Sequence, residues 1–284
     1  MTDLGAFLRS KRATMRPEDF GMPSGLSRRR VPGLRREELA LLAGISPDYY
    51  IRLEQGRGRN VSASVLDAVA DALCLDDDER TYLHNLARPA VRRTSAPRPQ
   101  QVRPGLLRLL DALYDVPAFI LGRRMDILES NDLARAVIGD FDGLPAEDHN
   151  AARLVFLHDG AERYPDFDTV ARQVVGNLRA YAGRHPDDPE MPALIGELSL
   201  RSQAFRELWA EHTVRECTQG SKRVRHPAVG EFTVTFETLC LPDDPDQSLV
   251  TYTADPGSDD EVSLRLLAGW VNDASLSDQR RRTR

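Results

Sequence analysis

The sequence has few cysteines, no long apolar run and none of the common catalytic motifs. Its three cysteines, Cys74, Cys217 and Cys240, are widely spaced and outside any CxxC pattern, so neither a disulfide framework nor a zinc site is expected. The longest apolar runs, such as 118–121, fall far short of the roughly 20 residues that cross a bilayer. The first residues also lack the apolar stretch of a signal peptide. We therefore expect a cytoplasmic protein that does not enter a membrane.

Residue patterns that would indicate an enzyme are also missing. The six histidines show neither HxxxH nor HExxH spacing, and there is no GxSxG or GxxxxGK[ST] motif. The segment HPDDPE at 185–190 gathers three carboxylates, but its prolines favour a turn over a calcium loop. The sequence therefore predicts no catalytic residue, no metal site and no cofactor, and an enzyme in the C-terminal part is the weakest of the alternatives.

Charge is distributed unevenly along the 284 residues, although the net charge is only −6. Residues 1–103 contain 18 basic and 13 acidic side chains, whereas the remainder contains 20 basic and 31 acidic ones. A polyanion would attract the first part and repel the second. Contact with nucleic acid is therefore expected only in the N-terminal third.

Two domains are expected from the chain length and from a change in residue pattern near residue 88. The segment 88–104 contains four prolines and several arginines and lacks apolar periodicity, as is typical of a linker. The pattern before it is helical throughout, and the pattern after it mixes helices with strands. The predicted parts are an all-α domain (1–88), a linker (89–104), an α+β domain (105–272) and a basic, frayed tail (273–284).

The most specific segment is RREELALLAGISPDYYIRLEQG at 35–56. Apolar residues three and four apart predict a helix that starts near Arg36, and Gly44 permits the left-handed conformation that ends it. Ser46 can cap a following helix, with Pro47 at its first position. Ala40 is small where two such helices would approach closely. The pattern predicts two short helices joined by a tight turn.

Any pair of packed helices could show these features without a role in DNA binding. The side chains on the outer face of the second helix argue against that reading, because they can all form hydrogen bonds, and because two arginines follow where the chain would meet phosphates. The outer positions are Asp48, Tyr49, Arg52 and Gln55, followed by Arg57 and Arg59.

On these residues the N-terminal part resembles the XRE family of repressor-like helix-turn-helix proteins, with five helices over residues 4–87. The resemblance implies that Ser46 contacts phosphate, that Asp48 and Arg52 face base edges in the major groove, and that Arg57 and Arg59 grip the backbone. The segment 17–34 is longer than a minimal repressor domain has, and its Arg28, Arg29 and Arg30 are candidate phosphate contacts. The implied partner is a double-stranded DNA operator, bound by a homodimer.

The C-terminal part shows alternating apolar residues at 232–236 and 250–254, which predict a β-hairpin with one buried face. The alternation shifts at Leu239 and Leu241, which indicates a bulge or an end to that face. Further strands are expected at 118–121, 126–129 and 214–225, and helices at 166–183 and 202–212. Ser258 and Glu261 predict the start of a last helix, on which Val262, Leu266, Leu267 and Trp270 form one stripe.

This part resembles the MmyB-like regulator ligand-binding domain, a PAS-like fold with an antiparallel sheet. The resemblance is carried by 117–131, by ELSLRSQAFRELWAEHTVRE at 197–216, by GSKRVRHPAVGEFTVTFETLCLPDDP at 220–245 and by LVTYTADPGS at 249–258. The sequence departs from the family pattern at two positions. Met125 stands where an aromatic residue is expected, and Cys217 stands where a polar residue is expected. The resemblance implies a small-molecule ligand, and a fatty-acid-like one has been suggested for this family.

Large apolar residues of this domain, with two arginines able to hold an anionic head group, are the candidates for a ligand pocket. They are Phe119, Met125, Phe156, Trp209, Phe236 and Tyr252, with Arg215 and Arg225. Each apolar position could equally be ordinary core. As an alternative, the C-terminal domain would serve only dimerisation or the binding of a protein partner.

Overall fold

The computed structural model describes residues 3–21, 33–57, 61–87, 99–139, 141 and 143–282, with the side chains of 272–282 left aside. The chain forms two compact units, and each is described by itself. The first contains the N-terminal helices together with Arg179–Glu190 and Glu207–Glu216, and the second contains Pro97–Leu178, Met191–Arg206 and the chain from Cys217 onward.

Within the described ranges 3–21, 33–57 and 61–87 there are five α-helices, as the sequence predicts. They are α1 (Asp3–Thr14), α2 (Arg36–Leu42), α3 (Pro47–Glu54), α4 (Ala63–Ala72) and α5 (Asp77–Ala87), with a short 3₁₀ turn at Pro17–Phe20. The predicted signals for the ends of these helices are present. Gly44 has a φ of 64° after α2, and the hydroxyl oxygen of Ser46 accepts a hydrogen bond from the amide of Tyr49 at 3.2 Å. Ser62 and Asp76 cap α4 and α5 in the same way.

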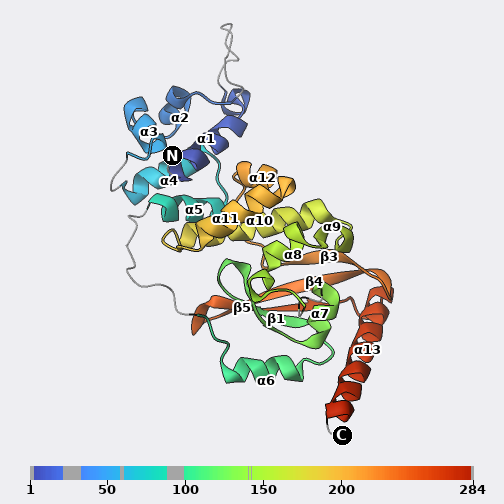
Figure 1. The fold of residues 1–284 in the computed structure, drawn as a ribbon. Helices are drawn as coiled ribbons and strands as arrows, with labels where there is room; N and C mark the ends of the chain where they lie inside the picture. The colour runs from blue at the N-terminus through green and yellow to red at the C-terminus, as the bar shows by residue number, and fades with distance from the viewer. Residues whose placement is uncertain are drawn as a thin grey trace. The chain divides into compact units, whose positions relative to one another are not determined.

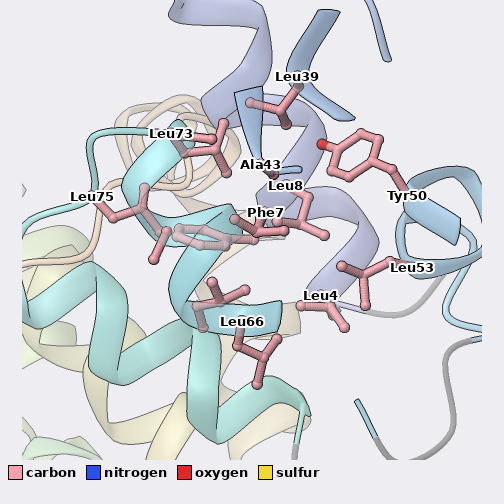
Figure 2. Packing of buried hydrophobic residues seen from close by; sticks show 14 of the residues in the cluster. Leu4, Phe7, Leu8, Leu39, Ala43, Tyr50, Leu53, Leu66, Leu73 and Leu75 are labelled. Atoms are coloured by element: carbon pink, nitrogen blue, oxygen red, sulfur yellow. The ribbon is translucent and has the colours of Figure 1, made fainter. Parts of the chain in front are cut away.

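The core of the first unit is built from one apolar face of each helix (Figure 2). Phe7 and Leu8 of α1 lie at its centre and are fully buried, together with Leu39 of α2 and Tyr50 of α3. Ala40 is also fully buried, which agrees with the need for a small residue between the two helices of the motif. Ala180 and Val214 complete the same core from the later part of the chain.

The second unit contains a five-stranded antiparallel sheet with strand order β2-β1-β5-β4-β3. Its strands are β1 (Ala118–Leu121), β2 (Ile127–Ser130), β3 (Gln219–His226), β4 (Gly230–Leu241) and β5 (Asp244–Thr253). The predicted hairpin is formed by β4 and β5, where Phe236 pairs with Tyr252. The strand register also shifts between Cys240 and Leu241, close to the position where the apolar alternation changes. The expectation of an α+β domain with an antiparallel sheet is confirmed.

Helices cover both faces of this sheet (Figure 1). The helix α6 (Pro104–Ala112) places Leu106 and Leu110 against Ala118, Ile120 and Leu249 on one face. Because side chains alternate along a strand, Phe119 and Val250 point to the opposite face, which α10 (Phe167–Arg184) covers.

The remaining helices of the C-terminal part connect and flank these layers. They are α7 (Asp132–Ile138), α8 (Ala151–Leu157), α9 (Gly160–Arg163), α11 (Met191–Arg201), α12 (Gln203–Ala210) and α13 (Asp259–Arg282), with short 3₁₀ turns at Arg123–Met125 and Ala146–Asp148. Among the described residues, no helix combines the length and the apolar character needed to cross a membrane.

Three predictions about this part need correction. The strand expected at 214–225 begins only at Gln219, because Val214 is buried in the core of the first unit instead. The helix α13 continues to Arg282, so most of the expected frayed tail is helical. Along α13, Leu267 is buried with Leu264, whereas Val262, Leu266 and Trp270 are exposed. Val262, Leu266 and Trp270 are spaced four apart and share one face of α13. The helix packs through the adjacent face, which carries Leu264 and Leu267.

We expect Leu39→Ala to lower the free energy of unfolding of the first unit by about 2–5 kcal/mol, because it leaves a cavity in the core. Leu41→Ala on the same helix is the matched control, because Leu41 is 76% exposed and Leu39 is 0% exposed. Urea unfolding followed by circular dichroism would measure both. Equal losses in the two variants would contradict this assignment of the buried face.

Candidate functional site

The exposed face of α3 carries the polar side chains that the sequence predicts for it. Asp48, Arg52 and Gln55 are exposed, and Tyr49 is half-buried. The Arg52 guanidinium lies 5.7 Å from the centre of the Tyr49 ring, which favours its orientation on this face. Tyr50 and Leu53 point the other way, into the core. The helix therefore has one anchored face and one face of hydrogen-bonding groups.

A buried carboxylate holds α3 against the two preceding helices. Glu54, at the end of α3, is 1% exposed. One carboxylate oxygen accepts a hydrogen bond from Arg12 Nε of α1 at 2.9 Å, and the other accepts from Arg36 Nε of α2 at 2.7 Å. Burial acts to raise the pKa of Glu54, but the hydrogen bonds from Arg36 and Arg12 outweigh it, and the pKa lies below its ordinary value.

The other predicted contacts of this surface divide into two groups. Ser46 is exposed at the first turn of α3, and Arg57 is exposed just beyond its end. Arg59 lies outside the described residues, as do Arg28, Arg29 and Arg30. The described surface therefore runs from Ser46 to Arg57 along one face of α3.

A second candidate site is a pocket between the sheet and the helices α8 and α10. The space between its walls is partly open to solvent. Its walls are mainly apolar, and Phe119, Phe236 and Tyr252 of the sheet contribute aromatic rings. The Tyr252 ring centre lies 5.8 Å from that of Phe119 and 6.5 Å from that of Phe236, so the three rings form one continuous surface. Such a pocket suits a molecule with an apolar body.

The pocket also contains a lysine in apolar surroundings. Lys222 enters it from β3, and its Nζ lies 4.6 Å from the centre of the Phe236 ring and 5.9 Å from that of Tyr252. Burial lowers the pKa of Lys222 to about 8, and the thiol of Cys217 opposes this only in part. Burial also raises the pKa of Tyr252 well above its ordinary value. Lys222 is thus the cation available to a ligand inside the pocket.

An unusual turn places Met125 in the pocket wall. Arg124 and Met125 both have positive φ values, 55° and 66°, which are uncommon for residues with a side chain. The fully buried Asn150 holds this turn, because its Nδ2 donates to the Arg124 carbonyl at 2.9 Å and to Asp126 Oδ1 at 2.8 Å. Its Oδ1 accepts from the amides of Ala152 and Arg153, which begin α8. One side chain therefore fixes both the turn and the adjacent helix.

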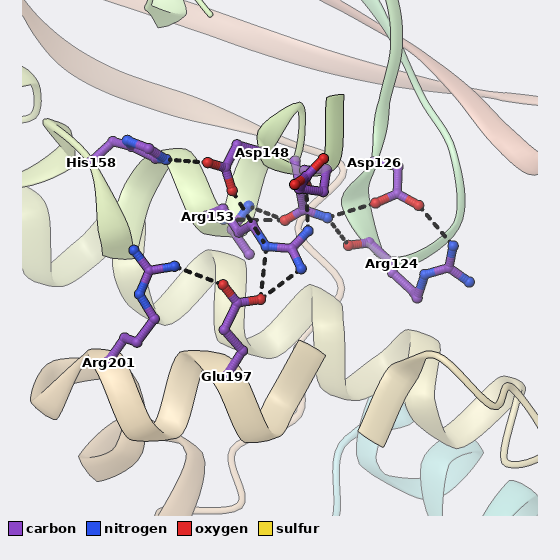
Figure 3. Close-up of polar contacts among 10 residues, drawn as sticks. Arg124, Asp126, Asp148, Arg153, His158, Glu197 and Arg201 are labelled. Atoms are coloured by element: carbon purple, nitrogen blue, oxygen red, sulfur yellow. Dashed lines mark hydrogen bonds and ion pairs between the residues drawn. The ribbon is translucent and has the colours of Figure 1, made fainter. Parts of the chain in front are cut away.

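A polar network continues from this turn across α8 to α11 (Figure 3). Arg153 of α8 donates two hydrogen bonds to Glu197 Oε2 of α11, at 3.0 and 2.7 Å. Glu197 Oε1 accepts from Arg201 at 2.8 Å, and Asp148 lies 3.5 Å from His158. The hydrogen bond from Arg153 lowers the pKa of Glu197. The network lies behind the pocket wall and keeps the turn and the two helices together.

Four of the predicted pocket residues line this cavity, namely Phe119, Met125, Phe236 and Tyr252. The other four lie elsewhere. Phe156 is buried against Phe167 and Phe205, and the Trp209 ring lies 4.0 Å from the Arg179 guanidinium. Arg215 is exposed, and Arg225 is exposed and paired with Glu231 at 2.6 Å. The charge that the sequence reading assigned to these two arginines is supplied in the pocket by Lys222.

Sequence reasoning missed Glu54, Asn150, Gln173 and Lys222. Strand parity could have revealed Lys222, because Gly220, Lys222 and the buried Val224 lie on the same face of β3. No local signal distinguishes the other three, because their roles depend on partners far away in the sequence. In the part of the chain that the structure describes, no group of three or more His, Cys, Asp or Glu residues could hold a metal.

We expect Glu54→Gln to destabilise the first unit by about 1.5–3 kcal/mol at pH 7, because neutral Gln loses two charge-assisted hydrogen bonds. Since the folded-state pKa of Glu54 is lowered, its contribution is present above its unfolded pKa and is lost as the pH falls through the folded value. Because Gln does not titrate, the free energy of unfolding of the variant should fall less than that of the unchanged protein as the pH drops from about 5 to 3.

Hydrogen exchange of the α1–α3 amides, followed by mass spectrometry, would measure this effect. Glu37→Gln is the control, because the side chain of Glu37 on α2 is 67% exposed. If Glu54→Gln matched this control both at pH 7 and in the range from about pH 5 to 3, the Glu54 carboxylate would have no structural role.

Comparison with protein-family models gives two matches, which together account for most of the chain. Residues 3–83 match a helix-turn-helix domain, and residues 102–267 match the MmyB-like transcription regulator ligand binding domain. No curated protein matches the sequence. The second match covers more than half of the 284 residues, and it describes a regulator and not an enzyme. The predicted MmyB-like domain and the predicted helix-turn-helix domain are thereby confirmed, and the chain belongs to the family of MmyB-like transcription regulators, with an N-terminal helix-turn-helix domain.

Proposed function

We propose that this regulator belongs to the XRE group and reads an operator in double-stranded DNA with the exposed face of α3. The observation that carries the proposal is the position of Arg52. It is exposed on α3, while Glu54 and Tyr50 fix the opposite side of the helix in the core. A rigidly held helix can place a guanidinium against the edge of a guanine in the major groove.

The other residues of the surface have separate roles in this proposal. Asp48, Tyr49 and Gln55 face neighbouring base edges, and Ser46 and Arg57 contact phosphates on either side. Arg28, Arg29, Arg30 and Arg59 supply further phosphate contacts. The protein acts in the cytoplasm as a homodimer, since repressor-like domains read paired half-sites about 34–36 Å apart.

The C-terminal domain senses an amphipathic acid similar to a fatty acid. The apolar pocket accepts the alkyl chain, and Lys222 binds the carboxylate. This role is supported by the pocket itself, since a domain used only for dimerisation or for a protein partner would not require a lysine inside an apolar cavity. A ligand that prefers one state of the domain would then shift the affinity for DNA.

For DNA, we expect Arg52→Ala to reduce the preference for the selected operator over scrambled DNA by about 1–3 kcal/mol. Arg57→Ala should instead weaken binding to all sequences and lower the salt slope by about one. The operator would first be selected from random DNA with the full-length protein, and affinities measured by fluorescence anisotropy at several salt concentrations. Arg265→Ala, at a residue 74% exposed on α13, is the control. If Arg52→Ala behaved like this control, α3 would not be the reading helix.

For the ligand, we expect dodecanoate to bind with constant affinity between about pH 6 and 8 and about tenfold more weakly for each pH unit above 8. The pKa of Lys222 is about 8 in the free protein, and a bound carboxylate favours the ammonium form. Isothermal titration calorimetry would show the decline.

Lys222→Met should bind the acid weakly at every pH, and Lys222→Arg should bind it without the decline, because arginine stays charged. A decline that persisted in Lys222→Met would assign the pH dependence to another group, such as the Cys217 thiol, and would remove Lys222 from the proposal.

A further inference from the structure

The polar groups of the pocket include an acceptor that the protein leaves without a partner. Gln173 lines the pocket from α10, and its Oε1 is buried and accepts no hydrogen bond from the described residues. Leaving such an atom unsatisfied is costly, and most buried polar atoms in proteins have a partner. A ligand with a hydrogen-bond donor at this position would supply what the protein does not.

Lys222 offers the complementary chemistry in the same pocket. The structure shows no hydrogen bond or ion pair for its ammonium group among the described residues, and its nearest charge-stabilising contacts are the rings of Phe236 and Tyr252. A cation in apolar surroundings favours an anion at hydrogen-bonding distance. The pocket thus has a site for a donor and a site for an anion.

The two sites lie beside the same aromatic ring. A Cβ atom at Gly220 would lie 3.0 Å from the Phe236 ring and 3.9 Å from Gln173 Nε2. Lys222 Nζ lies 4.6 Å from the centre of that Phe236 ring. Gly220 and Lys222 are two residues apart on β3 and share one face of the sheet. Because position 220 has no side chain, the Phe236 ring can lie directly against β3 beside Gln173.

We propose that the ligand is a hydroxylated aliphatic acid and that Gln173 selects it over the plain acid. This inference rests on the proposed function, since Lys222 again binds the carboxylate. The hydroxyl group, on carbon 2 or 3 of the acid, donates a hydrogen bond to Gln173 Oε1. The alkyl chain occupies the apolar part of the pocket, formed by residues such as Leu121, Ile127, Ile138, Leu154, Val174 and Val250.

The selectivity follows from a difference in binding free energy between the complex with the plain acid and the complex with the hydroxy acid. A plain acid would bury the Gln173 oxygen still without a donor, whereas a hydroxy acid pairs it. Sites built to hydrogen-bond a hydroxyl group discriminate strongly against the analogue that lacks it. Gln173 is therefore assigned as the residue that determines specificity, and Lys222 as the residue that provides affinity for acids in general.

The test compares dodecanoate, 2-hydroxydodecanoate and 3-hydroxydodecanoate by calorimetric titration of the full-length protein. We expect one of the hydroxy acids to bind at least about tenfold more tightly than dodecanoate. In Gln173→Met, which keeps the size of the side chain but removes the amide, all three acids should bind with similar affinity. Dodecanoate itself should bind this variant about as well as it binds the unchanged protein.

Gln101→Met is the matched control, because Gln101 is exposed and does not line this pocket. It should keep the full preference. Circular dichroism of both variants would confirm that they fold.

Two results would overturn the inference while leaving the proposed function intact: equal affinity of the unchanged protein for the three acids, or a hydroxyl preference that survives in Gln173→Met. If none of the three acids bound, the proposal of an acid-binding pocket would itself fail. These outcomes are distinct, because dodecanoate binding reports on the acid-binding pocket as a whole and the ratio of affinities reports on Gln173.

Discussion

The carboxylate of Glu54 connects the three helices on which the exposed surface of α3 depends. It is almost completely buried, and its two oxygens accept hydrogen bonds from Arg12 on α1 and Arg36 on α2. A buried charge is tolerated only when its partners are in place, so the three helices must adopt one relative arrangement for the contacts to form. Arg12 also donates to the Leu34 carbonyl at 2.6 Å, which brings the chain before α2 into the same arrangement. The orientation of Arg52 and its neighbours follows from this constraint.

In the second unit the corresponding constraint is the sheet with a helix layer on each face. The face toward α6 is closed by leucine and isoleucine side chains. The face toward α10 is not filled in the same way, and a partly open pocket lies there, beside the turn at Arg124 and Met125 that Asn150 holds. The result is a pocket with rigid walls, in which Lys222 and Gln173 are polar groups among apolar ones. Asn150 and the Arg153–Glu197 pair stabilise these walls without lining the polar end of the pocket (Figure 3).

Much of this fold could be predicted from short-range patterns. The positions of Gly44, Ser46 and Pro47 define the turn between α2 and α3, because capping and left-handed backbone are properties of a few consecutive residues. The alternation of apolar residues likewise defines β4 and β5 and their pairing as a hairpin. The exposed face of α3 was predicted for the same reason, since helical periodicity assigns each residue to a face. The exposed stripe on α13 shows the limit of this reasoning, because periodicity groups Val262, Leu266 and Trp270 together and does not say whether a neighbour covers them.

The sequence by itself therefore determined the helix-turn-helix motif, the hairpin and the charge asymmetry. Only the tertiary structure decided which polar residues act together. Glu54 meets Arg12 across 42 positions of the chain, and Asn150 meets Arg124 across 26. Similarly, the pocket combines Gln173 of α10 with Lys222 of β3, and it leaves Arg215 and Arg225 outside. Such groupings arise from the packing of whole elements, and the local free energies that set helices, strands and turns contain no information about them.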